Sequence, residues 1–492
     1  MPKKEIKSAR LIQMLRALTE KEFRDFRVFV KSPWFNRNER LINLTEYLYP
    51  AWPDFDKKTL EREKIFAVLY GDQTPCQEQQ VYDHFSFLIR LLETFFVQQS
   101  LDTDTAEYQR LLLSAFSAKN LENHFDRYYS KVEQEWEKNP FQGTDFFLEK
   151  YRIQREAVIQ FGKQQKRETD QHLPHLFRSL DQFYLSSRLR FTCEWLNRAN
   201  ILHTEPVESV ILPLRSLLNV MPLEFLENPS IKGYYRVFQI LTGETPSENY
   251  PKLVQLLKEH SDQIPREEIN ELYAHAQNFC IKMINQGQAD YHSHLFQLFQ
   301  DLLDQNLLIE NGHLDHRKYK NIVTVGLRMR AFDWVWNFLH EYREKLSPEY
   351  RENVFTYNLA AWHYELQQYH QALPLLNQVS FTDVYYHLSA KAMMLKIYFE
   401  MEEDLAFESL LDTFRIFLNR NRTISAYQRT VHKNMIRFAQ KAYRLRNKQG
   451  ILSAETLTQE TENLRAEINS VREVANINWL VGEIAKMGGG KF

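Results

Sequence analysis

The feature that most constrains the fold is a repeated helix–break–helix pattern between Asn353 and Asn419. Ala360 and Leu395 hold equivalent places in the two first helices, 35 residues apart. One helical hairpin cannot bury its apolar face alone, so hairpins of this kind stack and share a core. The pattern therefore predicts an all-α protein in which helical hairpins follow one another along the chain.

The composition agrees with helices joined by short loops. Only 13 Gly and 16 Pro occur among 492 residues, alongside 34 Phe and 25 Tyr. Few turn-forming residues and many long side chains favour helix over sheet. We expect essentially no sheet, and about five hairpins of unequal length between Ile231 and Asn419.

The order of large and small residues in this region resembles the tetratricopeptide (TPR) family, whose repeat is about 34 residues long. The residues that carry the resemblance are Leu359, Ala360, His363, Tyr369, Ala372 and Leu376, then Met394, Leu395, Tyr398, Phe407, Leu411 and Phe414. Phe407 departs from the family, which has a small residue there, so the repeat is degenerate and its helices would pack further apart. The resemblance implies an irregular TPR-like α-solenoid.

Four regions are expected along the chain. They are an N-terminal helical domain (1–103), a long-helix region (104–227), TPR-like hairpins with a basic closing helix (228–450), and a C-terminal helix with a flexible tail (451–492). In the first region Thr19 and Glu22 form a capping-box pattern, and Ser32-Pro33 ends the helix that follows. The last helix is predicted to run from Ile451 to Lys486.

Two short motifs resemble a group of uncharacterised cytoplasmic proteins of Bacteroidota. They are Lys31-Ser32-Pro33-Trp34-Phe35-Asn36 near the start and Trp479-Leu480 near the end. That resemblance implies a bacterial, cytoplasmic protein and carries no activity with it. The N-terminal residues lack the apolar core of a secretory signal, and no run of eighteen apolar residues occurs. The three cysteines, Cys76, Cys193 and Cys280, show no CxxC spacing, which favours reduced thiols.

The sharpest charge pattern lies between Arg415 and Lys448, a stretch without Asp or Glu. An apolar stripe runs along one face of the predicted helix Ser425–Lys448, through Ile424, Tyr427, Val431, Met435, Phe438, Ala442 and Leu445. The opposite face carries a basic ridge of Arg429, Lys433, Arg437, Lys441, Arg444 and Lys448. The ridge is either a surface for an anionic partner or a solvated closing helix whose charges meet the acidic stretch Glu455–Glu467.

A second candidate surface follows from the TPR resemblance, in which the first helix of each unit lines a concave groove. By position this groove would expose Arg317, Lys320, Arg328, Tyr357, Tyr364 and Lys396. Such a basic and aromatic groove suits an extended acidic peptide. It does not reproduce the Lys/Asn set with which some TPR co-chaperones clamp a C-terminal carboxylate.

No catalytic residue, cofactor site or metal site is predicted. His172 with His175, and His313 with His316, have i,i+3 spacing but no Cys partner and no HExxH pattern. We expect a non-catalytic scaffold or adaptor that binds another macromolecule. The first candidate for this partner is a protein that offers an acidic segment. The alternatives are a nucleic-acid binder that uses the basic ridge, and an enzyme on a helical scaffold. No membrane insertion is expected.

Overall fold

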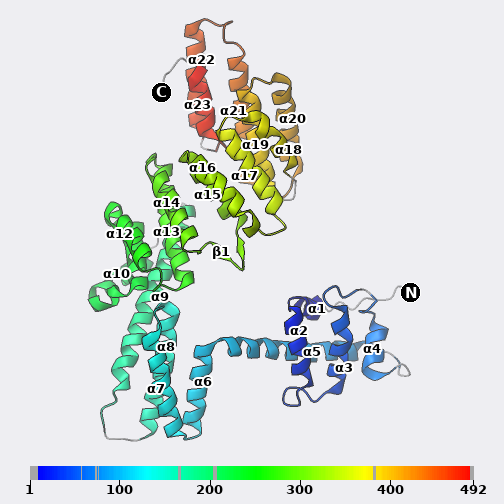
Figure 1. Ribbon diagram of the computed structural model, residues 1–492, viewed down its shortest axis with the longest axis vertical. Coiled ribbons are helices and arrows are strands. Elements are labelled where there is room, and N and C mark those ends of the chain that lie inside the picture. The colour runs from blue at the N-terminus through cyan, green and yellow to red at the C-terminus, as the bar shows by residue number, and fades with distance from the viewer. Residues whose placement is uncertain are drawn as a thin grey trace. The chain divides into compact units, whose positions relative to one another are not determined.

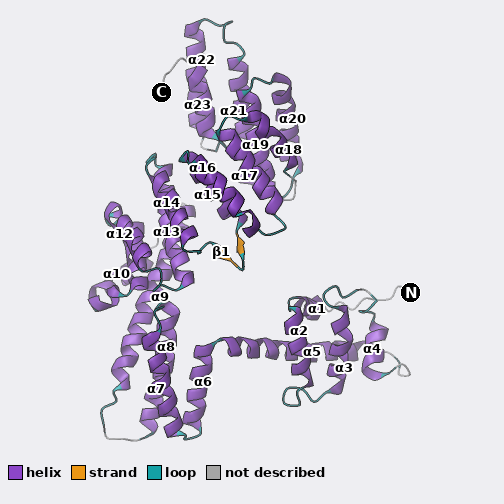
Figure 2. Cartoon of the chain, viewed as in Figure 1, coloured by secondary structure: helices purple, strands orange, loops and turns teal. Residues whose placement is uncertain are grey.

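The computed structural model describes residues 9–56, 58–71, 75, 77–164, 168–202, 208–379, 384–471 and 473–487. Over these residues the chain forms 23 α-helices, and its strands are limited to one hairpin of β1 (Ile309–Glu310) and β2 (His313–Leu314). Figure 2 shows this small orange element among purple helices. The predicted all-α class is therefore confirmed.

Contacts divide the chain into two compact units. Unit 1 comprises residues 1–192 and 207–231, and unit 2 comprises 193–206 and 232–492. The helices of unit 1 are α1 (Ala9–Arg16), α2 (Glu20–Lys31), α3 (Glu39–Leu48), α4 (Arg62–Tyr70), α5 (Glu78–Thr103), α6 (Thr105–Ala118), α7 (Glu122–Lys138), α8 (Thr144–Lys163), the first part of α9 (His172–Leu202) and α10 (Glu208–Val220).

The N-terminal helices pack around one hydrophobic core. Thr19 Oγ1 accepts the Glu22 backbone N–H and the Glu22 carboxylate accepts the Thr19 N–H, so the capping box at the start of α2 is confirmed. α2, α3 and α4 surround α5, which buries Phe85, Leu88 and Phe95. α8 and α9 are the two longest helices of the region 104–227, in which long helices were expected.

The remaining helices belong to unit 2. Its helices are the end of α9, most of α11 (Pro229–Leu241), α12 (Pro246–Glu259), α13 (Arg266–Asn285), α14 (Tyr291–Asp304), α15 (His316–Arg328), α16 (Phe332–Glu341), α17 (Arg351–Glu365), α18 (Tyr369–Gln378), α19 (Val384–Glu400), α20 (Asp404–Arg420), α21 (Ala426–Arg446), α22 (Ala454–Ser470) and α23 (Ile477–Met487).

Consecutive helices of unit 2 pack as hairpins from α13 onward. α13 packs on α14, α15 on α16, α17 on α18 and α19 on α20, while α17 also contacts both α15 and α19. In Figure 1 these helices lie side by side from green to orange. Ala360, Ala372 and Leu395 are fully buried, as the repeat pattern requires. At Gly326 a Cβ atom would lie 2.5 Å from Val335 Cγ2, so α15 and α16 approach too closely there for a larger residue.

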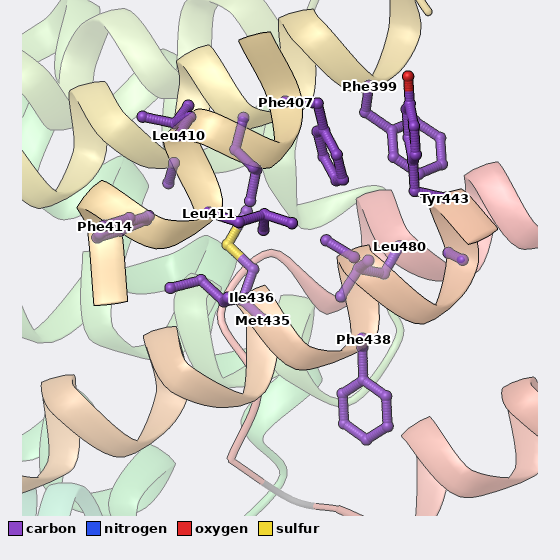
Figure 3. Close-up of a cluster of buried hydrophobic side chains, with 14 of the residues drawn as sticks. Phe399, Phe407, Leu410, Leu411, Phe414, Met435, Ile436, Phe438, Tyr443 and Leu480 are labelled. Atoms are coloured by element: carbon purple, nitrogen blue, oxygen red, sulfur yellow. The ribbon is translucent and has the colours of Figure 1, made fainter. Parts of the chain in front are cut away.

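The closing helices share one core, shown in Figure 3. Phe407, the residue that departs from the TPR pattern, is fully buried and stacks on Tyr443 with ring centroids 4.1 Å apart. Phe399 meets both rings edge-on. The large side chain at position 407 therefore fills space that α19, α20 and α21 enclose together.

One prediction about the C-terminal part needs correction, and another cannot be compared with the structure. The stretch predicted as one helix from Ile451 to Lys486 forms two helices, α22 and α23, which pack on each other and on α21. The chain must turn between them because the apolar residues of α23, such as Leu480 and Ile484, are drawn into the core of α21. The predicted flexible tail Gly488–Phe492 lies outside the described residues, as does Cys76.

Candidate functional site

The predicted groove residue Lys320 lies among aromatic side chains of the following first helices. Its ammonium is 4.9 Å from the ring centroid of Tyr357 and 5.1 Å from that of Tyr386. It also donates a hydrogen bond of 2.7 Å to Ser389 Oγ. Cation–π contacts of this kind stabilise an ammonium and fix its position. α15, α17 and α19 therefore meet at Lys320.

The two tyrosines predicted to face the groove are buried instead. Tyr357 is 7% exposed and Tyr364 is 9% exposed. Burial raises the pKa of Tyr357 to about 12, and raises that of Tyr364 as well, with Glu400 adding to the effect. The predicted exposure was wrong because the neighbouring first helix covers each ring and places a lysine over it.

Glu400 at the end of α19 joins four helices. Its carboxylate accepts hydrogen bonds from Tyr364 Oη at 2.6 Å, from Tyr369 Oη, and from the indole Nε1 of Trp479 at 2.7 Å. These donors come from α17, α18 and α23. A carboxylate with several such donors is a strong local link. The Trp479-Leu480 motif therefore acts within the fold: Trp479 binds Glu400 and Leu480 is fully buried.

Lys396 lies one turn before Glu400, with its ammonium 4.2 Å from the ring centroid of Tyr364. Burial lowers the pKa of this ammonium, while Glu365 and Glu400 oppose the shift. Lys320 and Lys396 are therefore both held on aromatic rings of α17. Arg328 acts on Lys396 through its charge and is itself exposed, at the end of α15. Arg317 is exposed at the start of α15 and pairs with Asp315.

The basic ridge of α21 divides into engaged and exposed residues. The Arg429 guanidinium donates to the backbone carbonyls of Leu418 at 2.7 Å, Asn421 at 3.0 Å and Ile424 at 3.3 Å. These carbonyls lie at the end of α20 and just beyond it, where backbone acceptors lack helical partners. Arg429 therefore closes the end of α20.

Further along the ridge, Lys441 Nζ lies 2.7 Å from both carboxylate oxygens of Glu467, and Lys448 lies 3.6 Å from Glu460. These pairs agree with the interpretation that the ridge meets the acidic stretch. Lys433, Arg437 and Arg444 are exposed. One residue of the predicted apolar stripe was misplaced: Tyr427, in the first turn of α21, is 59% exposed, whereas Ile424 before it and Val431 after it are buried.

A pocket that the sequence analysis missed lies among α13, α14 and α15. Its volume is about 350 Å³, and its apolar lining includes Ile281, Phe299 and Val325. The polar lining consists mainly of the amides Asn270, Gln277, Asn278 and Asn321, together with Tyr273, Thr324 and Lys318. Gln277 Nε2 is buried and has no hydrogen-bond partner in the part of the chain that the structure describes.

The packing of the helices explains why this pocket is open. α15 packs on α17 and α17 on α19, but within the described residues α13 and α15 do not pack on each other to a comparable extent. α14 forms the floor between them. No local pattern could have found the pocket, because its amides come from two helices that are separated in sequence by a third.

In each histidine pair considered as metal ligands, one member lies beside an aromatic ring. His172 meets Tyr129 edge-on, and His316 stacks on Tyr350. Among the described residues, no three His, Cys, Asp or Glu side chains gather closely enough to hold a metal ion. Cys193 and Cys280 are both buried, and burial raises the pKa of each thiol. Within the same residues, no helix combines the length and apolar character needed to cross a membrane.

Three comparisons with known proteins found no match for this chain, whether among protein-family models, curated protein sequences or solved structures.

Proposed function

We propose that this chain is a non-catalytic, cytoplasmic scaffold or adaptor, built as an irregular TPR-like solenoid. It binds a protein partner through the face formed by the first helices of its hairpins, such as α13 and α15, which we call the first-helix face. The observation that carries the proposal is the amide-lined pocket among α13, α14 and α15, with the unpartnered donor Gln277 Nε2. The partner is an extended peptide segment that places one apolar side chain in the pocket.

The chemistry of the lining supports a peptide ligand. A carboxamide offers both a donor and an acceptor, so it can pair with the N–H and C=O groups of an extended backbone. Ile281, Phe299 and Val325 offer an apolar surface for a side chain. A buried donor without a partner costs free energy, and a bound backbone carbonyl would remove that cost. Arg328, exposed at the end of α15, favours an acidic sequence beside the anchor.

A nucleic-acid partner remains the second candidate because Lys433, Arg437 and Arg444 stay exposed along α21. Three cations on one helix face can contact a phosphate backbone. The surface is small for this purpose, since Arg429, Lys441 and Lys448 are engaged by the fold.

Paired variants separate the two candidates. Affinity capture from native cell extract, followed by mass spectrometry, is performed with the wild type, with Gln277→Ala plus Asn321→Ala, and with Lys433→Glu plus Arg437→Glu. The amide variant should lose the protein partner, and the ridge variant should retain it. The captured partner is then reduced to a peptide whose affinity is measured by fluorescence anisotropy.

Two results together would instead support the nucleic-acid candidate. Only the ridge variant would lose the captured partner, and nuclease treatment would abolish capture by the wild type. Both variants should keep the wild-type melting temperature. The amide of Gln277 has no partner to lose among the described residues, and exposed charges contribute little to stability.

A further inference from the structure

The turn after α2 holds the Lys31–Asn36 motif in a fixed conformation. Asn36 is buried, and its amide donates to the carbonyls of Val30 at 2.9 Å and Asn38 at 3.1 Å. Its side-chain oxygen accepts the Asn38 N–H at 2.9 Å. These bonds tie the end of α2 to the start of α3. The residues between them are therefore presented by a rigid turn.

The aromatic residues of this turn differ in their contacts. Phe35 stacks on Phe29 of the core, with ring centroids 4.0 Å apart. Trp34 is 89% exposed and makes no hydrogen bond or ring contact within the described residues. Exposing a large apolar ring at a rigid position costs free energy that burial against a partner would recover. Tryptophan at such a place is typical of residues that dominate binding.

A basic depression adjoins the turn. It has a volume of about 950 Å³ and is lined by Phe35, Arg37, Arg40, Phe87 and Arg90, among others. Arg40 is held over the ring of Tyr70 at 4.3 Å, and the Arg90 guanidinium lies 5.8 Å from the ring centroid of Phe87. Phe87 is itself 45% exposed.

The three arginines of the depression lack acidic partners. Among the described residues, no carboxylate lies within ion-pair distance of Arg37, Arg40 or Arg90. Glu39 is the one carboxylate in the lining, which leaves positive charge in excess. Guanidinium groups match carboxylates in geometry and can bind them through two parallel hydrogen bonds.

We propose that the depression formed by the α2–α3 turn and α5 is a second docking surface, which binds an acidic linear peptide segment of a partner protein. In this complex the carboxylates of the peptide pair with Arg37, Arg40 and Arg90. An apolar side chain of the peptide packs between Trp34 and Phe87. All residues of this surface belong to unit 1, whereas the residues of the proposed first-helix site belong to unit 2.

The charge distribution favours a peptide over a nucleic acid. The whole chain has a formal net charge of -2, so no extended positive field is available to attract a long polyanion. Arg37, Arg40 and Arg90 line one depression, and a group of this size matches a few carboxylates. Apolar side chains, including Leu41 and Leu91, also line it and suit an aliphatic or aromatic anchor.

The proposal makes the protein bivalent, which goes beyond binding through the first-helix face. A scaffold that joins two proteins needs two surfaces that can be occupied together. Two sites in separate units also strengthen capture of a partner that carries both recognition sequences, by raising the effective concentration of the second one.

The test uses the full-length chain and a fluorescein-labelled peptide of roughly 12 residues, rich in Glu with a central Leu-Phe pair. Anisotropy is measured at about 50 and about 300 mM salt. The wild type should bind the peptide, more weakly at the higher salt. Arg37→Glu with Arg90→Glu should weaken binding at least about tenfold, and Trp34→Ala about tenfold.

Matched controls lie on the same unit. Arg24→Glu changes an exposed arginine of α2, and Tyr108→Ala removes a half-exposed ring of α6; both should bind as the wild type does. A peptide with Lys in place of Glu and a single-stranded oligothymidylate serve as further probes. Equal affinity in the wild type and the Arg37→Glu, Arg90→Glu variant would overturn the proposal. So would binding of the oligothymidylate alone, or no binding of the acidic peptide.

The test is independent of the first-helix site. Gln277→Ala with Asn321→Ala should leave the affinity for the acidic peptide unchanged. Either proposed site can therefore be disproved without affecting the other.

Discussion

The two tryptophan motifs, one near each end of the chain, show opposite uses of the same side chain. Trp479 is half-buried, donates its indole N–H to Glu400 and meets Phe399 edge-on. Trp34 is almost fully exposed and makes neither kind of contact in the described part of the chain. The first ring holds helices together, and the second is available to a partner. A residue type at a motif position therefore does not reveal its role until its contacts are known.

The arginines of the two regions repeat the contrast. Arg429 donates to four backbone carbonyls of its own chain, whereas Arg37 donates to one, that of Pro33, and lines an open depression with Arg90. A charge already bound by the fold contributes to stability. A charge without a partner in the fold contributes to solubility and to binding.

The largest expected effect separates the two tryptophans. Trp479→Ala removes a hydrogen bond to a carboxylate and a half-buried ring, and should lower the free energy of unfolding by about 2–3 kcal/mol. Trp34→Ala should change it by less than about 0.5 kcal/mol. Chemical unfolding followed by circular dichroism measures both. Equal losses in the two variants would contradict the contrast.

The next effect concerns the arginines. Arg429→Ala leaves backbone carbonyls at the end of α20 without their charged donor, and should cost about 1.5–3 kcal/mol. Lys433→Ala, one turn further along the same ridge, is the matched control and should cost less than about 0.5 kcal/mol. Melting temperatures of the two variants provide the measurement. If Arg429→Ala melts like the wild type, the guanidinium does not act as a cap.

A buried histidine of α19, His387, should make the stability of the protein depend on pH. Burial lowers the pKa of His387 on α19 to about 4, from 6.5 in the unfolded chain, and nearby Lys391 adds to this shift. Between these values the unfolded state binds a proton that the folded state does not. The stability contributed by neutral His387 is therefore present above pH 6.5 and is lost as the pH falls towards 4.

His387→Gln should remove that part of the pH dependence, on the order of 1–2 kcal/mol between pH about 7 and about 5. The difference between wild type and variant, measured by denaturant unfolding at both pH values, isolates this histidine from the carboxylates that also titrate. Parallel pH profiles for the two proteins would show that His387 is not shielded from protons in the folded state.

The smallest expected effect is on the exposed part of the ridge. Lys433→Glu with Arg437→Glu should shift the free energy of unfolding by less than about 0.5 kcal/mol, because neither side chain has an acidic partner in the described residues. Capture of the protein partner should also be unchanged. A strongly destabilised double variant would mean that the exposed charges of α21 support the fold as Arg429 does.

The sequence by itself determined the helices and their buried faces. The spacing of Ala360, Ala372 and Leu395 predicted residues that prove to be fully buried, and the Thr19–Glu22 pattern predicted a capping box that forms. Such features depend on neighbours three to four positions away, which the geometry of a helix brings together wherever the helix lies.

Only the tertiary structure decided which side chains contact other parts of the fold and which remain exposed to solvent. Glu400 and Trp479 are 79 residues apart, and the depression near Trp34 joins a turn to α5, about fifty positions further along the chain. Tyr357 and Tyr364 were assigned to an exposed face because a single helix does not reveal what covers it. Partners of this kind depend on how helices pack, and helical periodicity is the same whether a face meets a neighbour or water.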